Sequence, residues 1–115
     1  MVTLYIASTE TFSGKSALCV GLGRHFQHDG YRIGYMKPVS TAARLAAGLA
    51  DEDAEFIQQT FGVPDSMDDM VPVGVTPRVV EAILSGEEID FQARLMEAYQ
   101  RVTHGRDVVI LEGGS

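Results

Sequence analysis

A Gly-Lys-Ser triplet at residues 14–16 constrains the fold of this chain more than any other feature of its sequence. A short, β-rich and mostly apolar segment at residues 2–7 precedes it, separated from it by a polar loop. From Lys15 to about His28 apolar residues recur with the spacing of a helix that packs on a sheet. They are Ala17, Leu18, Val20, Leu22 and Phe26. The order predicts a buried strand, a loop, and a helix that begins at the triplet.

The triplet consists of residue types that can hold a phosphate group. Gly14 lets the backbone approach closely, Lys15 would reach the β and γ phosphates, and the Ser16 hydroxyl would bind Mg²⁺. Successive N–H groups and the positive end of the helix would complete an anion-binding cradle. We expect nucleotide contacts from Thr11, Phe12, Ser13, Gly14, Lys15, Ser16 and Ala17.

The spacing of this loop departs from the standard phosphate-loop pattern. The pattern G-x-x-x-x-G-K-[ST] requires glycine at position 9, where this chain has Thr9. An ordinary helix-capping loop is therefore the alternative interpretation. The position of the triplet, directly between an N-terminal apolar strand and a helix, favours phosphate binding.

The remaining segments predict an α/β domain with a mostly parallel sheet. Residues 31–36 and 107–112 have the composition of two further strands, and we expect Pro38 to end the first of these. Helices are predicted from the acidic run at 51–53 to about 61, from 77 to 84 and from 90 to 102. Residues 62–75 are predicted to be a loop, and the Ala-rich residues 40–50 either a loose loop or a short helix. Right-handed crossovers would place helices on both faces, giving a three-layer P-loop fold.

Two charged residues follow predicted strands at the edge where the loop lies. Lys37 ends the second strand and Glu112 ends the third, and ligands bind beyond the carboxyl ends of strands in such sheets. Lys37 would face the γ-phosphate or an anionic acceptor, unless it is a solvated strand-end lysine. Glu112 would hold Mg²⁺ or its water, since an unpaired buried carboxylate is costly. A simple exit from the strand is the alternative for Glu112.

Asp53 is the third candidate magnesium ligand, directly or through water. Asp51 competes for the same role. An acid in the first turn stabilises a helix without any metal, so a structural role is equally open for Asp53. The predicted metal set is Ser16, Asp53 and Glu112, and the predicted catalytic pair is Lys15 and Lys37.

Composition narrows the possible partners and compartment. The 115 residues suit one domain, and a formal charge of −7 argues against a general nucleic-acid surface. No apolar run approaches the roughly 20 residues that cross a bilayer. A single cysteine fits a reducing cytoplasm. Because a strand turns through two glycines and then stops, we expect residues 1–115 to be the front part of one P-loop domain.

Several residues are expected to have no functional role. Cys19 is predicted to be a core residue of the first helix, and the three histidines to lie on the surface. The acids at 65–69 are predicted to form a solvated loop.

Four motifs in order resemble the dethiobiotin synthetase family of P-loop proteins, which includes cobyrinate-type amidoligases. The family loop, roughly Gly-Thr-Asp-Thr-x-x-Gly-Lys-Thr/Ser, corresponds to residues 8–16 (STETFSGKS) and has five residues between its glycines. A Lys-Pro-Val, an Asp-Ala and a strand-end Glu-Gly correspond to residues 37–39, 53–54 and 112–113. The resemblance covers essentially the whole chain.

The resemblance implies that ATP and Mg²⁺ are cofactors. In that family ATP phosphorylates a carbamate made from CO₂ and a diamine, and the mixed anhydride closes to a cyclic urea. By position, Lys15 would hold phosphate and Lys37 would stabilise the carbamate and the γ-phosphate. Ser16, Asp53 and Glu112 would surround Mg²⁺. The family also implies a homo-oligomer.

Where this chain departs from the family motifs, it resembles a second group of proteins more closely. Ser8 replaces the first family glycine, Glu10 replaces aspartate, and the family's Glu-Gly-Ala-Gly-Gly ends as residues 112–115 (EGGS). These features resemble the dethiobiotin synthetase-like N-terminal domain of long bacterial phosphotransacetylases, which implies a nucleotide-sensing regulatory module followed by a separate C-terminal domain. An ATP-dependent carbamate- or carboxylate-activating enzyme is the alternative. A domain kept only for packing or oligomerisation is a third.

Overall fold

A three-stranded parallel sheet forms the centre of the molecule. The computed structural model describes residues 1–7, 14–41 and 51–113. The strands β1 (Val2–Ile6), β5 (Val108–Glu112) and β2 (Ile33–Met36) lie in the order β1-β5-β2. Both outer strands align their first residue with the first residue of β5. The α/β class with a parallel sheet is therefore confirmed.

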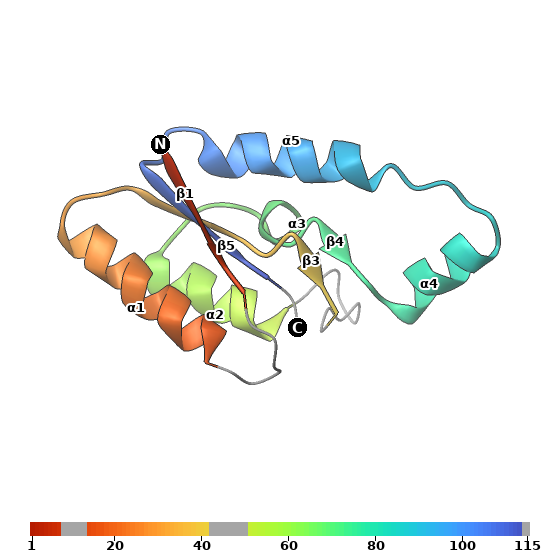
Figure 1. Cartoon of the computed structure of the whole chain (residues 1–115), viewed down its shortest axis with the longest axis horizontal. Coiled ribbons are helices and arrows are strands. Elements are labelled where there is room, and N and C mark those ends of the chain that lie inside the picture. The colour runs from red at the N-terminus through yellow and green to blue at the C-terminus, as the bar shows by residue number, and fades with distance from the viewer. Residues whose placement is uncertain (8–13, 42–50, 114–115) are drawn as a thin grey trace.

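Helices cover both faces of this sheet (Figure 1). Helices α1 (Lys15–His28) and α2 (Glu52–Phe61) pack on one face, and α5 (Phe91–Thr103) packs on the other. Side chains alternate along a strand, so β5 serves both layers. Its residues Val108 and Ile110 belong to the α1–α2 cluster, whereas Val109 belongs to the α5 cluster. Glu112 has the same parity as Val108 and Ile110, which directs it to the α1–α2 side.

The contact between α1 and α2 depends on a glycine. A Cβ atom built on Gly23 would lie 2.1 Å from the Cζ atom of Phe61, so only glycine admits the ring here. Cys19, one turn earlier, is fully buried as predicted. The predicted apolar face of α1 was partly wrong, because Ala17 and Leu18 are exposed while Val20, Leu22 and Phe26 are half-buried. The helix turns Cys19 and Gly23 to the core instead.

The segment predicted as a loop at 62–75 contains ordered structure, which corrects that expectation. Helix α3 (Met67–Met70) and strand β4 (Val73–Gly74) lie within it, and β4 pairs in parallel with β3 (Val39–Ser40). Pro38 therefore ends β2 but does not end strand structure. The chain moves from one sheet to another at Pro38, and the N–H of Lys37 donates to the Met70 carbonyl at 2.7 Å.

The acids at 65–69 are not a solvated loop, which is a second correction. Asp65 accepts a hydrogen bond from Arg106 at 2.8 Å, and both side chains are largely buried. Asp69 accepts from Arg101 at 2.7 Å. These ion pairs join the segment before β4 to α5 and to the turn that follows it.

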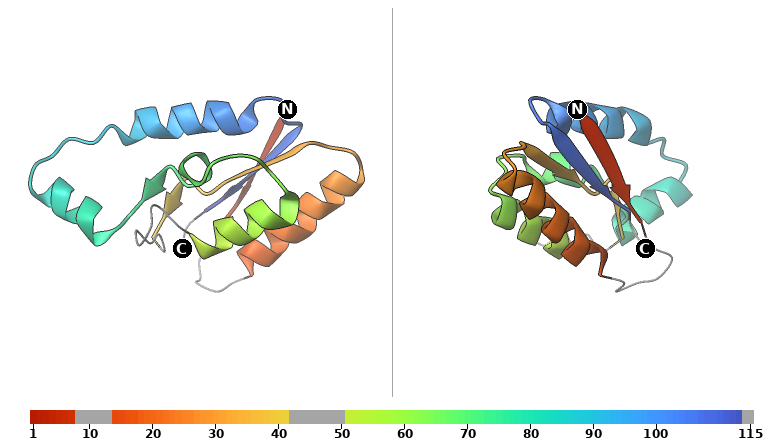
Figure 2. Two further views of the ribbon diagram at one scale, coloured as in Figure 1. Left: turned by 180° about the vertical axis from the view of Figure 1, so that it is seen from behind. Right: turned by 60° about the vertical axis from the view of Figure 1, so that its left-hand side comes forward.

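Helix α4 (Pro77–Leu84) begins where the sequence predicts, with Thr76 capping the N–H of Val79. None of its residues is buried, and its apolar face is exposed. The left view in Figure 2 places α4 at one end of the molecule, away from the three-stranded sheet. Among the helices of the described residues, none has the length and apolar character needed to cross a membrane.

Candidate functional site

Three chain segments meet at one edge of the sheet because its strands are parallel. The chain leaves β1 toward the start of α1, leaves β2 at Lys37, and leaves β5 at Gly113. The N–H of Gly113 donates to the Ile6 carbonyl at 2.8 Å, which joins the ends of β1 and β5. The sheet edge at which we expected Lys15, Lys37 and Glu112 to meet is therefore formed by segments that are far apart in the sequence.

The start of α1 differs from the starts of the other helices. Gly14 precedes it in the left-handed conformation, with φ of 84°, and no side chain of residues 1–7, 14–41 and 51–113 caps the helix. The four later helices each begin with a side-chain oxygen that accepts an N–H, from Asp51, Ser66, Thr76 and Asp90. The first turn of α1 has no acid and contains Lys15 and Ser16. This end of α1 is suited to an anion from outside the helix.

Glu112 is a buried carboxylate next to that helix end. It is 1% exposed. Its Oε1 accepts a hydrogen bond from the Ser16 hydroxyl at 2.7 Å, and its Oε2 accepts from the Tyr35 hydroxyl. Within the described residues, no lysine or arginine lies within ion-pair distance of Glu112. A buried negative charge compensated only by neutral donors indicates a place for a cation.

Lys15 contacts the backbone directly after Glu112. Its Nζ donates to the Gly113 carbonyl at 2.8 Å. The lysine ammonium and the glutamate carboxylate therefore lie at the same strand end without pairing with each other. That separation leaves a positive and a negative group side by side, which is the arrangement that a metal-bound phosphate requires.

Lys37 is largely buried, at 8% exposure, and lies between two carboxylates. Its Nζ is 3.2 Å from Oδ2 of Asp51 and 3.8 Å from Oδ2 of Asp53. Asp51 is itself buried, accepts from the Ser40 hydroxyl, and caps α2 through the N–H of Ala54 at 3.1 Å.

The environment of Asp51 determines its ionisation. Burial works to raise the pKa of Asp51, but the bonds from Ser40 and Ala54 and the charge of Lys37 outweigh it and lower that pKa. Asp51 is thus engaged as a helix cap and an ion-pair partner. Asp53, whose side chain is 57% exposed, is the acid with room for another ligand.

The structure brings some predicted residues together and leaves others apart. Ser16 and Glu112 are hydrogen-bonded, whereas Asp53 lies on the Lys37 side of the edge. The part of the chain that the structure describes contains no group of three or more His, Cys, Asp or Glu residues suited to a metal. Mg²⁺ needs only one or two carboxylates when phosphate and water supply the other ligands, so Ser16 and Glu112 fit it. Thr11, Phe12 and Ser13 lie outside the described residues, and Ala17 is exposed in the first turn of α1.

Sequence reasoning missed Tyr35 as a member of this site. Tyr35 is fully buried in β2, and burial, followed by the charge of Glu112, raises the pKa of its phenol. A tyrosine inside a predicted buried strand was the available signal, because a buried phenol needs a hydrogen-bond partner. Cys19, also near Glu112, has its pKa raised to about 12, mainly by burial. Its thiol therefore stays protonated and is not a nucleophile.

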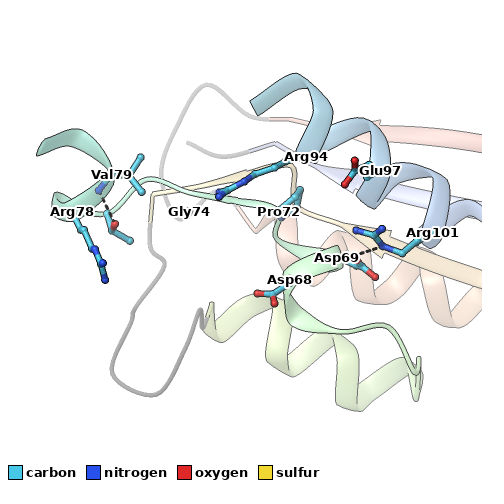
Figure 3. A pocket seen from close by; sticks show the side chains of 10 residues that line it. Asp68, Asp69, Pro72, Gly74, Arg78, Val79, Arg94, Glu97 and Arg101 are labelled. Atoms are coloured by element: carbon cyan, nitrogen blue, oxygen red, sulfur yellow. Dashed lines mark hydrogen bonds and ion pairs between the residues drawn. The ribbon is translucent and has the colours of Figure 1, made fainter. Parts of the chain in front are cut away.

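A separate hollow of about 420 Å³ lies away from this edge, between α3, β4, α4 and α5 (Figure 3). Its charged lining residues are Asp68, Asp69, Arg78, Arg94, Glu97 and Arg101. Acids and arginines are equal in number there, and one pair, Arg101 and Asp69, is already joined. The hollow therefore has no charge bias toward a phosphate. We place the candidate site at the strand edge.

Comparison with known proteins is consistent with this geometry. The chain is 29% identical to the ATP-dependent dethiobiotin synthetase BioD of Caldicellulosiruptor saccharolyticus, covering 98% of this chain and 48% of that protein. It is 31% identical to the BioD of Aromatoleum aromaticum over 95% of this chain and 50% of that protein. It is 27% identical to the phosphate acetyltransferase of Pseudomonas putida over 98% of this chain but only 15% of that protein.

The chain thus spans about half the length of the synthetases and a small part of the acetyltransferases. The model of the AAA domain family matches residues 2–115, which is nearly the whole chain. The chain therefore belongs to this AAA domain family and is a dethiobiotin synthetase-like P-loop domain.

Proposed function

We propose that this domain binds Mg-ATP at the strand edge, with the phosphates at the start of α1. The observation that carries the proposal is the buried Glu112 carboxylate, which accepts hydrogen bonds from the Ser16 and Tyr35 hydroxyls and lies beside a helix start that none of the described side chains caps. A cation at Glu112 and an anion at Lys15 would each supply the charge that the other lacks. Mg²⁺ with nucleotide phosphates provides both charges in one ligand.

Each residue then has a defined task. Lys15 leaves the Gly113 carbonyl and contacts phosphate, while the N–H groups at the start of α1 bind phosphate oxygens. Ser16 and Glu112 hold Mg²⁺, and Asp53 joins them directly or through water. Mg²⁺ held by these residues would supply positive charge to offset that of the phosphates. The protein contributes mainly position and electrostatic stabilisation.

The role we favour is nucleotide sensing, in a regulatory module associated with a phosphotransacetylase. The similarity to phosphate acetyltransferases supports it. The charge of Lys37 supports it too, because Asp51 and Asp53 already offset that charge. A lysine compensated in this way attracts an anionic acceptor less strongly than an uncompensated one. A C-terminal domain, a homo-oligomer and a cytoplasmic location remain predictions.

The second candidate is ATP-dependent activation of a carbamate or carboxylate, as in a dethiobiotin synthetase or a cobyrinate-type amidoligase. The position of Lys37 favours this role, because Lys37 directly follows β2 at the sheet edge where Lys15 and Glu112 also lie. The similarity to dethiobiotin synthetases supports it as well. Here Lys37 would have to exchange one carboxylate partner for the substrate.

Calorimetric titration with Mg-ATP tests binding. We expect saturable binding by the wild type, loss of binding in Lys15→Ala, and wild-type binding in Arg24→Ala. Arg24 is an exposed cation of the same helix and serves as the matched control. Absence of binding by the wild type, or unchanged binding by Lys15→Ala, would contradict the proposal.

Phosphate release then separates the two roles. A sensing module should bind ATP and release little phosphate whether or not an acceptor is present. An activating enzyme should release phosphate only when a diamino acid and CO₂, or a carboxylate acceptor with ammonia, is added. Acceptor-dependent release would replace the sensing role with the enzymatic one.

A further inference from the structure

We infer that Tyr35 is a positioning residue that keeps the Glu112 carboxylate in place for the metal; this inference rests on the proposed Mg-ATP site. Strand β2 aligns Tyr35 with Ile110 of β5, and Glu112 lies two residues further along β5. Side chains two residues apart on a strand point to the same face. The phenol of Tyr35 therefore reaches along the α1–α2 face to Oε2 of Glu112.

The two oxygens of Glu112 are held from two different elements. Ser16 of α1 donates to Oε1, and Tyr35 of β2 donates to Oε2. Both donors are neutral, so they orient the carboxylate without cancelling its charge. Lys37 and Asp51 show the opposite arrangement in the same layer, because a cation there offsets the buried acid. The two hydroxyl donors thus leave the charge of Glu112 available to a cation.

Ser16 and Tyr35 differ in what happens when the metal binds. Ser16 would itself be a metal ligand, so its hydroxyl is shared between the ion and Glu112. Tyr35 is buried inside the sheet layer, and its hydroxyl is hydrogen-bonded to Glu112. It is therefore the donor that holds Glu112 in the loaded state. Outer-shell hydrogen bonds of this kind set the orientation of metal ligands.

Tyr35→Phe isolates this role because it keeps the ring in the core and removes only the hydroxyl. Tyr99→Phe is the matched control, since its hydroxyl is hydrogen-bonded to Thr3 at 2.9 Å on the other face of the sheet. We would measure ATP affinity by calorimetry across a series of Mg²⁺ concentrations and in excess chelator. Thermal unfolding of each variant would show that it is folded.

We expect Tyr35→Phe to raise the Mg²⁺ concentration for half-maximal ATP binding by about 10- to 100-fold. The affinity for metal-free ATP should not change, and Tyr99→Phe should behave as the wild type. Unchanged Mg²⁺ dependence in Tyr35→Phe would overturn the inference. So would an equal loss of affinity with and without Mg²⁺, because that result indicates general damage to the fold.

A double-mutant cycle with Glu112→Gln tests whether Tyr35 acts through Glu112. Glutamine keeps an acceptor but removes the charge, so Glu112→Gln alone should weaken the Mg²⁺ dependence. Adding Tyr35→Phe should then have no further effect on that dependence, whereas an additive effect would contradict the inference. Failure of the wild type to bind Mg-ATP would overturn the proposed function and this inference together. Failure of the Tyr35 variants alone leaves the proposed function intact.

Discussion

Helices α2 and α4 have similar sequence signals and very different surroundings. Each begins at a capped N-terminus and carries apolar residues at helical spacing. In α2 these residues are buried, with Ile57 at 0% exposure, whereas Ile83 of α4 is 48% exposed. The α2 face meets the sheet and α1, while α4 follows the two-stranded sheet away from the core (Figure 1). Local signals thus define a helix, and tertiary contacts decide whether its apolar face contributes to stability.

The same substitution in the two helices should give the largest contrast. Ile57→Ala removes methyl groups from the centre of the core and should lower the free energy of unfolding by about 2–5 kcal/mol. Ile83→Ala should change it by no more than about 0.5 kcal/mol, because its side chain packs little in the described structure. Denaturant unfolding of both variants measures the difference. An equally large loss in Ile83→Ala would show that the apolar face of α4 is covered in solution.

Two glycines of α1 provide a sharper test of how closely α1 packs against α2. Gly23→Ala would place a Cβ against the Phe61 ring and should cost about 1–3 kcal/mol through overpacking. Gly21→Ala meets nothing within 4 Å and should stabilise the helix by about 0.8–1.0 kcal/mol. Thermal melts of the two variants should therefore shift in opposite directions. Shifts in the same direction would mean that α1 and α2 do not pack as closely as described.

The smallest expected effect concerns the caps of two helices and depends on pH. The pKa of Asp51 is lowered in the folded protein, so the unfolded chain binds a proton first as the pH falls. Stability from ionised Asp51 is complete above about pH 4, the ordinary aspartate range, and is lost as the pH falls through the folded-state pKa. Asp51→Asn keeps a capping oxygen but removes the charge that Lys37 faces, so it should flatten this acid dependence and also lower stability at neutral pH, where only Asp53 remains as a carboxylate partner of Lys37.

Asp90→Asn is the control for that prediction. Asp90 also caps a helix, through the N–H of Ala93 at 2.9 Å, but it is exposed and has no buried lysine beside it. Its variant should keep the acid dependence of the wild type. Unfolding measured between neutral pH and pH 3 would show whether the two caps differ.

The elements with strong local signals could be predicted from sequence. The start of α1 at Lys15, the Asp51 cap of α2 and the Thr-Pro start of α4 each have a physical cause that lies within a few residues. Strands β3 and β4, with two residues each, could not be predicted. They are held by pairing with one another and by the N–H of Val75 on the Ser40 carbonyl, which are contacts between distant segments.

The candidate site also has some residues that local signals predict and others whose contacts depend on distant segments. Lys15, Lys37 and Glu112 could be placed at one edge because each follows a strand or begins a helix there. Their partners could not be predicted, because the bond from Tyr35 to Glu112 depends on the register of β2 against β5. The sequence alone favoured Asp53 as the metal ligand and left Asp51 as its rival. In the structure Asp51 is buried and accepts from the Ser40 hydroxyl, which comes from a strand in another sheet, whereas Asp53 is exposed.

The position of β5 determines when this protein can acquire its site during synthesis. Strands β1 and β2 are made early, but in the three-stranded sheet each pairs only with β5, which is the last described strand to leave the ribosome. Until β5 is made, β1 and β2 lack the strand that joins them in this sheet. Such non-local pairing slows folding. If the proposed nucleotide site exists, nucleotide added during refolding should leave early collapse unchanged and act only after β5 has paired, by slowing unfolding.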